Sequence, residues 1–230
     1  ILNNLKDLKE ELTRHRDSSQ KHIKIACAPT FTYIMHDVLV KFSVKNDDVT
    51  FELDEQNTTK IIKNFTKNSY DLAFVAASKG ELEKENNLHY EFLDSGIICI
   101  VVGKNSPLYH LDYVTANELN HQKVVMYNFS NKDFLQLAKK FKNEIVLKSN
   151  RTLTLIEIIK ESPFFTFVHN TTIKNFPEVL NGELKVLPIK DNDQDYFKQD
   201  FWVVSPNSNS ITNACKEFIE YVRKTLTFMT

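Results

Sequence analysis

Polar side chains follow three apolar runs of the sequence, at points where a helical pattern is about to begin. Thr30–Thr32 follow the run at 21–28, Asn128–Ser130 follow the run at 124–127, and Arg151 follows the run at 145–148. The first N–H groups of a helix lack partners within it and lie at the positive end of its dipole, so such stretches bind anions. An arginine adds a two-pronged donor for a carboxylate. We expect a small anionic ligand to bind Thr30, Phe31, Thr32, Asn128, Phe129, Ser130, Arg151 and Thr152.

Two further stretches are candidates for the same ligand site. Thr166, Phe167 and His169 end another apolar run, and Ser95 and Gly96 lie within a long one, where a small residue allows close backbone approach. Each candidate also has a simpler structural interpretation. A threonine caps a helix, an Asn-rich segment forms a turn, an arginine lies at the surface, a histidine belongs to the core, and a glycine marks a β-bulge. The sequence alone leaves both interpretations open.

Motifs of known catalytic sites are absent from the sequence. There is no Gly-x-Ser-x-Gly, no His-Glu-x-x-His and no glycine-rich phosphate loop, and the whole chain has only 4 glycines. The 7 histidines and 3 cysteines do not show metal-ligand spacing. We therefore predict no catalytic residue, no metal and no cofactor.

The composition is that of an ordinary globular protein. The chain has 230 residues, is 42% hydrophobic and carries a net charge of −1. A domain that binds DNA by itself usually has a basic excess, so we expect little DNA binding from this chain alone. No apolar run approaches the roughly 20 residues of a membrane span, and no signal peptide is recognisable. The odd number of widely spaced cysteines, two of them in strand-like runs, fits core residues in a reducing cytoplasm.

The pattern along the first part of the chain predicts a parallel sheet. Apolar runs at 21–28, 49–54 and 71–76 alternate with helical periodicity at 31–44 and 58–67. Strands that alternate with helices over short links form a βαβαβ unit. After a polar loop and a long β region at 88–102, a similar pattern restarts, with strands at 124–127, 145–148, 164–168, 184–189 and 201–205 and helices at 114–120, 132–141, 153–161, 171–176 and 211–226.

Residues 1–17 form a different kind of segment. Ile1, Leu5, Leu8 and Leu12 lie four, three and four positions apart and make one narrow apolar stripe. A stripe this short needs a partner helix. Because the chain opens at Ile1 within a helical pattern, we expect it to be a fragment of a longer protein.

The order of these segments resembles LysR-type bacterial transcription regulators. The resemblance lies in KHIKIACA, then Pro29-Thr30, an apolar helix, VTFELDEQ where that family has a strand ending in Glu-Gly, and DLAFVAA where it has Asp-Leu-Ala-Ile. The segment LHYEFLDSGIICIVVGKNSPL is similar to the next stretch of those regulators. Asp48 replaces a common Pro, Gln56 replaces the Gly, and residues 161–166 lack the expected Gly-x-Gly-Ile.

The resemblance implies an α/β fold of the type 2 periplasmic-binding-protein class, with two Rossmann-like lobes around a cleft. It implies a linker helix at 1–20, regulatory lobe I at 21–102 and 202–230, and regulatory lobe II at 103–201. It also implies a cytoplasmic homodimer, tetrameric when full-length, that binds DNA only through a helix-turn-helix domain N-terminal to Ile1. In that family the start of the first helix, here Thr30–Thr32, contacts a carboxylate or similar group of the effector.

Three functions remain open from the sequence. The first is a sensor domain that binds a small anionic effector in the interlobe cleft, with no membrane association. The second is an extracytoplasmic solute-binding protein of the same fold, which has no use for a helix at 1–17. The third is an enzyme of this fold, for which no acid–base pair stands out.

Overall fold

The computed structural model describes residues 21–83, 88–128, 132–173, 176–190, 197–206 and 211–227. Within these ranges the chain forms two compact units. Unit 1 contains the described residues up to Leu93 and those from Phe201 onward, and unit 2 contains those from Asp94 to Asp200. No helix among the described residues is both long and apolar enough to cross a membrane. The predicted linker segment 1–20 lies outside the described residues.

Unit 1 is built on the parallel sheet that the sequence predicts. Its strand order is β2-β1-β3-β9, in which β1 is parallel to both of its neighbours and β9 is antiparallel to β3. β3 is buried along its whole length, because helices cover both faces of the sheet. The strands are β1 His22–Cys27, β2 Thr50–Glu55, β3 Leu72–Ala76 and β9 Lys198–Ser205.

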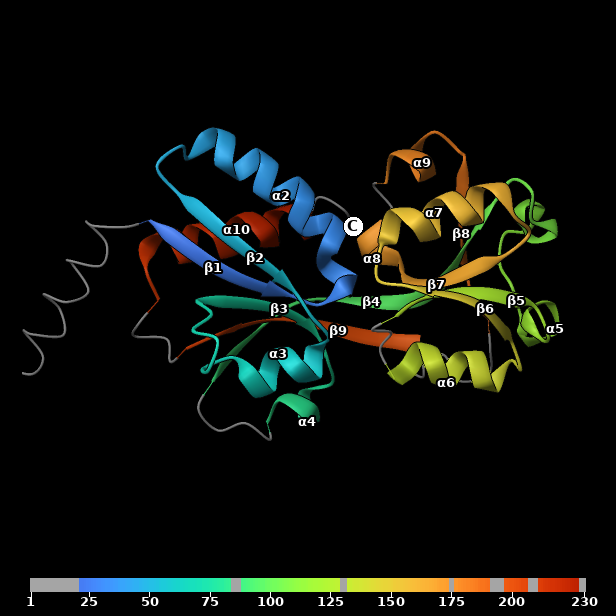
Figure 1. Ribbon diagram of the computed structural model, residues 1–230, viewed down its shortest axis with the longest axis horizontal. Helices are drawn as coiled ribbons and strands as arrows, with labels where there is room; N and C mark the ends of the chain where they lie inside the picture. The colour runs from blue at the N-terminus through green and yellow to red at the C-terminus, as the bar shows by residue number, and fades with distance from the viewer. Residues whose placement is uncertain are drawn as a thin grey trace, which may run out of the picture. The chain divides into compact units, whose positions relative to one another are not determined.

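Helices cover both faces of the unit 1 sheet. α2 Thr32–Lys45 and α10 Asn213–Thr227 lie on one face, and α3 Thr58–Asn64 and α4 Lys79–Leu82 lie on the other (Figure 1). The apolar side of α10 faces inward, as its sequence pattern predicts, and the ring of Phe218 packs 5.2 Å from Phe42 and 6.1 Å from Phe74. Aromatic packing of this kind holds α10 and α2 on the same sheet face.

Unit 2 has a mixed sheet with the order β8-β4-β7-β5-β6. β5 is parallel to β6 and β7, whereas β4 is antiparallel to β7 and β8. The strands are β4 His89–Gly103, β5 Lys123–Tyr127, β6 Glu144–Ser149, β7 Phe165–His169 and β8 Leu184–Pro188.

The unit 2 sheet separates two apolar cores. α6 Lys132–Lys140 packs Leu137 and Ala138 into one core, and α7 Thr152–Glu161 packs Leu155, Ile156 and Ile159 into the other (Figure 1). Gly103 ends β4 where α7 passes, and a Cβ there would meet the Ile159 carbonyl oxygen at 2.3 Å. The smaller helices are η2 Pro107–His110, α5 Ala116–Leu119, α8 Asn170–Ile173 and α9 Pro177–Leu180.

The division between the units falls within strands. β4 runs without a break across residues 93 and 94, and β9 runs across 200 and 201. The boundaries predicted from the sequence, 102/103 and 201/202, differ because the long apolar pattern at 88–102 contains no break that marks the crossing. The assignment of the two units as regulatory lobes stays a prediction.

Two short helices escaped the sequence analysis. α4 lies in a segment predicted to be a polar loop, where Ser78 and Glu81 form a reciprocal capping box. α9 begins at Pro177, directly after the predicted helical turn. All three cysteines are buried, as the core interpretation of Cys27 and Cys99 predicts.

Candidate functional site

The first candidate stretch, Thr30–Thr32, connects β1 to α2. Pro29–Phe31 form a single 3-10 turn (η1), and α2 follows without a break. Phe31 is fully buried, and its ring centroid lies 5.9 Å from that of Phe74 and 5.4 Å from that of Phe201. The Phe31 ring therefore belongs to the core, which leaves only its backbone for contact with a ligand.

The prediction that Thr30 or Thr32 caps the helix is wrong. Neither η1 nor α2 has a side-chain cap. The Phe31 N–H donates to the Ala28 carbonyl at 2.8 Å, and the Thr32 N–H donates to the Pro29 carbonyl. The Thr32 hydroxyl instead donates to the Glu55 carboxylate, since β2 ends beside the start of α2. The turn thus uses internally several donors that the sequence assigns to an anion.

Two carboxylates lie at the carboxyl end of β2, beside the end of β1. Glu55 pairs in register with Cys27 and is half-buried. Burial raises the pKa of the Glu55 carboxyl, and the hydrogen bond from Thr32 opposes that rise. Burial, together with the charges of Glu55 and Asp54, raises the pKa of the Cys27 thiol. This edge of the sheet is therefore acidic.

Asp54 is held from two sides. It accepts hydrogen bonds from the Tyr70 hydroxyl and, at 2.8 Å, from the Gln56 side-chain amide. Burial and the hydrogen bond to Asp54 raise the pKa of Tyr70 to about 12, so the phenol stays a donor at neutral pH. Glu55 and Asp54 were not among the residues singled out from the sequence, although both stand directly at a predicted strand end.

In unit 2, Asn128 lies at the end of β5 and is exposed, and its N–H donates to the Ser149 carbonyl at 2.8 Å. Phe129 and Ser130 lie outside the described residues. The chain enters α6 at Lys132.

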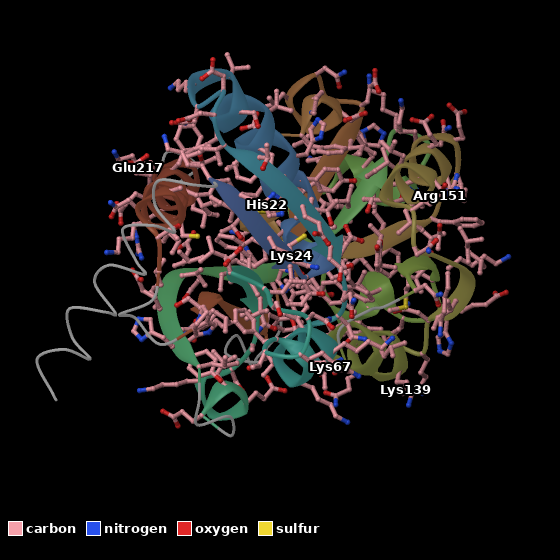
Figure 2. All side chains as sticks on the ribbon, turned by 60° about the vertical axis from the view of Figure 1, so that its left-hand side comes forward. His22, Lys24, Lys67, Lys139, Arg151 and Glu217 are labelled. Carbon is pink, nitrogen blue, oxygen red and sulfur yellow. The ribbon has the colours of Figure 1, made fainter. Side chains whose placement is uncertain are left out.

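Arg151 and Thr152 stand at the start of α7. The Arg151 N–H donates to the Ser149 hydroxyl at 3.0 Å, and α7 begins at Thr152. The Arg151 side chain is exposed, as Figure 2 shows, and it makes no ion pair with a carboxylate of the described residues. The guanidinium is thus available to solvent for a ligand anion.

The end of β7 is buried and uncharged. Thr166, Phe167 and His169 are all buried, and His169 is only 1% exposed, with its ring centroid 5.1 Å from that of Phe134. Burial lowers the pKa of His169 to about 3, so its imidazole is neutral at physiological pH. The structure therefore places His169 in the core rather than at the surface.

Thr171, which follows β7 in α8, was not singled out from the sequence. It is 4% exposed, and its hydroxyl makes no hydrogen bond to the described residues. Nearby, the Asn170 side-chain oxygen accepts the Ile97 N–H at 2.8 Å and joins this strand end to β4. The sequence did contain a signal for this polar strand end: the four polar residues His169–Thr172 come directly after an apolar run.

Ser95 and Gly96 lie within β4. The Ser95 hydroxyl donates to Asp200 at 2.6 Å, which joins β4 to β9, and Gly96 is buried. The structure shows that Ser95 contacts Asp200, which is far away in the sequence. From the sequence, the only argument for Ser95 and Gly96 was that small residues allow close backbone approach.

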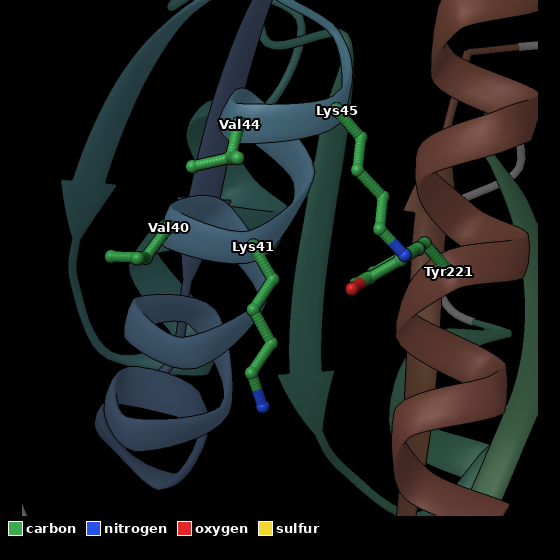
Figure 3. A pocket seen from close by; sticks show the side chains of 5 residues that line it. All are labelled: Val40, Lys41, Val44, Lys45 and Tyr221. Atoms are coloured by element: carbon green, nitrogen blue, oxygen red, sulfur yellow. The ribbon is translucent and has the colours of Figure 1, made fainter.

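An open hollow of about 270 Å³ lies between α2 and α10 in unit 1, away from the predicted site residues (Figure 3). Val40, Lys41 and Val44 come from α2, and the Lys45 ammonium lies 5.4 Å from the centre of the Tyr221 ring of α10. Within the described ranges, no cluster of three or more His, Cys, Asp or Glu residues is arranged to hold a metal ion.

The fold is that of the type 2 periplasmic-binding proteins, and its solved neighbours are effector-binding domains. The effector-binding domain of QuiR in complex with shikimate superposes with a TM-score of 0.64 and 15% identity, covering 90% of this chain and 97% of that one. The reduced regulatory domain of OxyR2 from Vibrio vulnificus superposes with a TM-score of 0.66 and 17% identity, covering 91% and 97%. A putative LysR family transcriptional regulator from Pseudomonas aeruginosa superposes with a TM-score of 0.67 and 12% identity, covering 96% of this chain and 78% of that one.

The sequence identifies the family directly. The family model for the LysR substrate binding domain matches residues 16–227, so this chain belongs to that family. A probable RuBisCO transcriptional regulator of Trieres chinensis is 23% identical over 77% of this chain. The match spans 66% of the length of that relative.

Proposed function

We propose that this chain is the effector-sensing domain of a LysR-type bacterial transcription regulator. The observation that carries the proposal is the family match over residues 16–227, which includes both units. A helix-turn-helix domain N-terminal to Ile1 would bind DNA, and the span of only 66% of the length of the regulator from Trieres chinensis supports such a further domain. The whole regulator would act in the cytoplasm.

The effector in this proposal is a small metabolite with an anionic group. Polar residues at the strand ends of the two units would bind it: Thr30–Thr32 in unit 1, and Asn128–Ser130, Arg151–Thr152 and Thr166–His169 in unit 2, together with Ser95 and Gly96. Arg151 is the strongest candidate for the anion, because its exposed guanidinium offers paired donors to a carboxylate. The ligand acts on DNA binding only if it binds one conformation more tightly than another.

We also propose that the chain forms an isologous homodimer, tetrameric when full-length. Val40 and Val44 of α2 are 54% and 82% exposed, and Leu53 of the edge strand β2 is also exposed. In unit 2, Leu137 and Ala138 of α6 and the nearby Phe141 are buried in the core. The exposed Ile145 on the edge strand β6 supplies the apolar surface there instead.

The proposal includes no catalytic role. The polar groups at the end of β7 in unit 2 are buried and neutral, and those at the end of β2 in unit 1 are held by the contacts of Glu55 and Asp54. Such groups suit ligand recognition by hydrogen bonds better than proton transfer.

A mobility-shift assay tests the proposed function. The full-length protein should bind duplex DNA upstream of its own gene, and the isolated chain should not, given its net charge of −1. In a thermal-shift screen of metabolic acids that includes shikimate, a ligand at about 100 times its dissociation constant should add roughly 2.7 kcal/mol of stability. The same ligand should change the DNA-bound fraction of the full-length protein. Tight, salt-sensitive DNA binding by the isolated chain would contradict the proposal.

A further inference from the structure

We infer that the anionic group of the effector binds to the backbone at the start of α7, and that the buried hydroxyl of Thr171 binds a second polar group of the same molecule. In this we rely on the function proposed above and deepen it, because the inference adds Thr171 to the site and limits the class of effector. Both groups belong to unit 2, so the inference does not depend on unit 1.

The start of α7 has N–H groups that the helix does not use. Its first hydrogen bond runs from the Leu155 N–H to the Arg151 carbonyl at 3.3 Å, and no side chain caps the helix. The N–H groups of residues 152–154 precede that bond, and none of them has an acceptor among the described residues. Arg151, directly before them, is exposed. Unused N–H groups at the positive end of a helix dipole, next to a cation, favour an anion.

The Thr171 hydroxyl is a second and independent observation. Thr171 is 4% exposed, and its Oγ1 makes no hydrogen bond within the part of the chain that the structure describes. Polar groups inside proteins are nearly always hydrogen-bonded, because burial of an unpaired one destabilises the fold. A hydroxyl retained at that cost is explained if a ligand provides its partner.

Thr171 and the start of α7 lie at the same edge of the unit 2 sheet. β6 leads into α7 and β7 leads into α8, and both strands are parallel to β5, which lies between them. Their carboxyl ends are therefore two strand spacings apart, roughly 10 Å. α7 and α8 also cover the same face of the sheet, since Leu155 and Ile173 belong to one apolar cluster (Figure 1).

This spacing limits the effector to a class of small acids. Each hydrogen bond takes up about 3 Å, which leaves roughly 4 Å between the anion and the second polar group of the ligand. A four-carbon dicarboxylate or a ring acid with a hydroxyl away from the carboxylate has such a spacing. An α-hydroxy acid does not, because its two groups are adjacent. The Thr171 hydroxyl both donates and accepts, so a hydroxyl, a carbonyl or a carboxylate suits it.

Matched ligands test this class by calorimetry on the whole chain. The pairs are succinate with butyrate, 3-hydroxybenzoate with benzoate, and shikimate with cyclohexene carboxylate. In each pair that binds, the member with the second polar group should bind at least roughly fivefold more tightly, the effect of one buried hydrogen bond. Lactate should gain no such advantage over propionate.

A proline at the start of α7 tests the anion contact. Thr152→Pro removes one of the unused N–H groups, and proline is well tolerated at the first position of a helix. Arg151 already has the extended backbone that a residue before proline prefers, with φ −113° and ψ 109°. Thr152→Pro should therefore bind the acids at least roughly fivefold more weakly than the matched variant Thr152→Ala, which keeps the N–H.

Thr171→Val tests the buried hydroxyl with two readouts of opposite direction. Valine has the same shape without the unpaired group, so the melting temperature of the ligand-free chain should rise by roughly 2 °C or more. The same variant should lose the advantage of the acids with a second polar group. Thr171→Ser keeps the hydroxyl and should keep that advantage. Thr225→Val, which removes a hydroxyl bonded to the Tyr221 carbonyl in α10, should also leave it unchanged.

Failure of the inference differs from failure of the proposed function. If no acid in a broad screen binds, the proposed function fails, and the inference fails with it. If acids bind but Thr152→Pro and Thr152→Ala have equal affinities, or Thr171→Val keeps the ligand preference, the inference is overturned and the proposed function stands. A loss of stability in ligand-free Thr171→Val would also overturn it, because the hydroxyl would then be bonded within the fold.

Discussion

The two units place different chemistry at the carboxyl ends of their strands. In unit 1, the acids Asp54 and Glu55 end β2, and burial raises the pKa of Glu55. In unit 2, β7 ends in a buried neutral His169 with a pKa of about 3, and an exposed cation, Arg151, follows the end of β6. Similar α/β architecture therefore carries an acidic strand end in one unit and a neutral-to-basic one in the other.

This difference shows that a similar α/β architecture does not give the two units the same chemistry at their strand ends. A helix start after a parallel strand is a general anion site, yet its neighbours decide whether it is vacant. The start of α2 is occupied by an internal carboxylate. At the start of α7, the guanidinium of Arg151 is exposed.

The largest expected effect is a loss of stability in unit 1, and it tests whether the Phe31 ring packs in the core. Phe31→Ala removes a fully buried ring from between Phe74 and Phe201 and should destabilise the chain by about 3–5 kcal/mol. Phe92→Ala, a half-exposed residue that packs edge-on against Trp202, should cost only about 1 kcal/mol. Urea denaturation measures both. Equal losses would show that the Phe31 ring is not a core residue.

The next effect concerns the buried histidine of unit 2. A base whose folded-state pKa is depressed contributes stability above its unfolded pKa, and that stability is lost as the pH falls toward the folded value. With the pKa of His169 at about 3 against 6.5 in the unfolded chain, acidification from pH 6.5 to 5 should cost about 2 kcal/mol. His169→Phe, which retains a ring beside Phe134, should remove this part of the pH slope.

The exposed His36 provides the control for that slope. His36→Gln should leave the change in unfolding free energy between pH 6.5 and 5 as it is in the wild type. If His169→Phe and His36→Gln behave alike, His169 is not buried in its neutral form.

The smallest expected effect is in unit 1, where the pH dependence of stability has the opposite sign to that of His169. The folded-state pKa of Glu55 is raised, so its contribution to stability is full below the unfolded pKa and is lost as the pH rises through the folded value. Glu55→Gln keeps an acceptor for Thr32 and should therefore raise the melting temperature slightly at pH 7 but not near pH 4. Glu52→Gln is the matched control variant on the same strand. If Glu55→Gln raises the melting temperature equally at pH 7 and near pH 4, this account of Glu55 is contradicted.

Periodicity predicts most of the elements because one helix face or both strand faces are buried throughout. The strands β1, β3 and β5 and the helices α2, α7 and α10 lie close to their predicted positions. The short helices α4 and α9 were missed, since one turn is too short to establish a period.

The site was less predictable than the fold for a physical reason. Strand ends are local features, and the sequence locates Thr32 and Arg151 correctly at helix starts. The partner of Thr32 is Glu55, 23 positions away, and only the register of β1 with β2 brings them together. Likewise, nothing local in the sequence separates a core His169 from a ligand-binding one.

A calorimetric titration of the tightest-binding acid from the screen tests the central claim most directly. It should be run on the wild-type chain, on Arg151→Ala and on Lys139→Ala, which removes an exposed cation of α6 (Figure 2). If the strand ends of these units bind an anionic effector, Arg151→Ala should weaken binding at least roughly tenfold, and Lys139→Ala should leave it unchanged. Equal affinity in all three proteins would contradict the account.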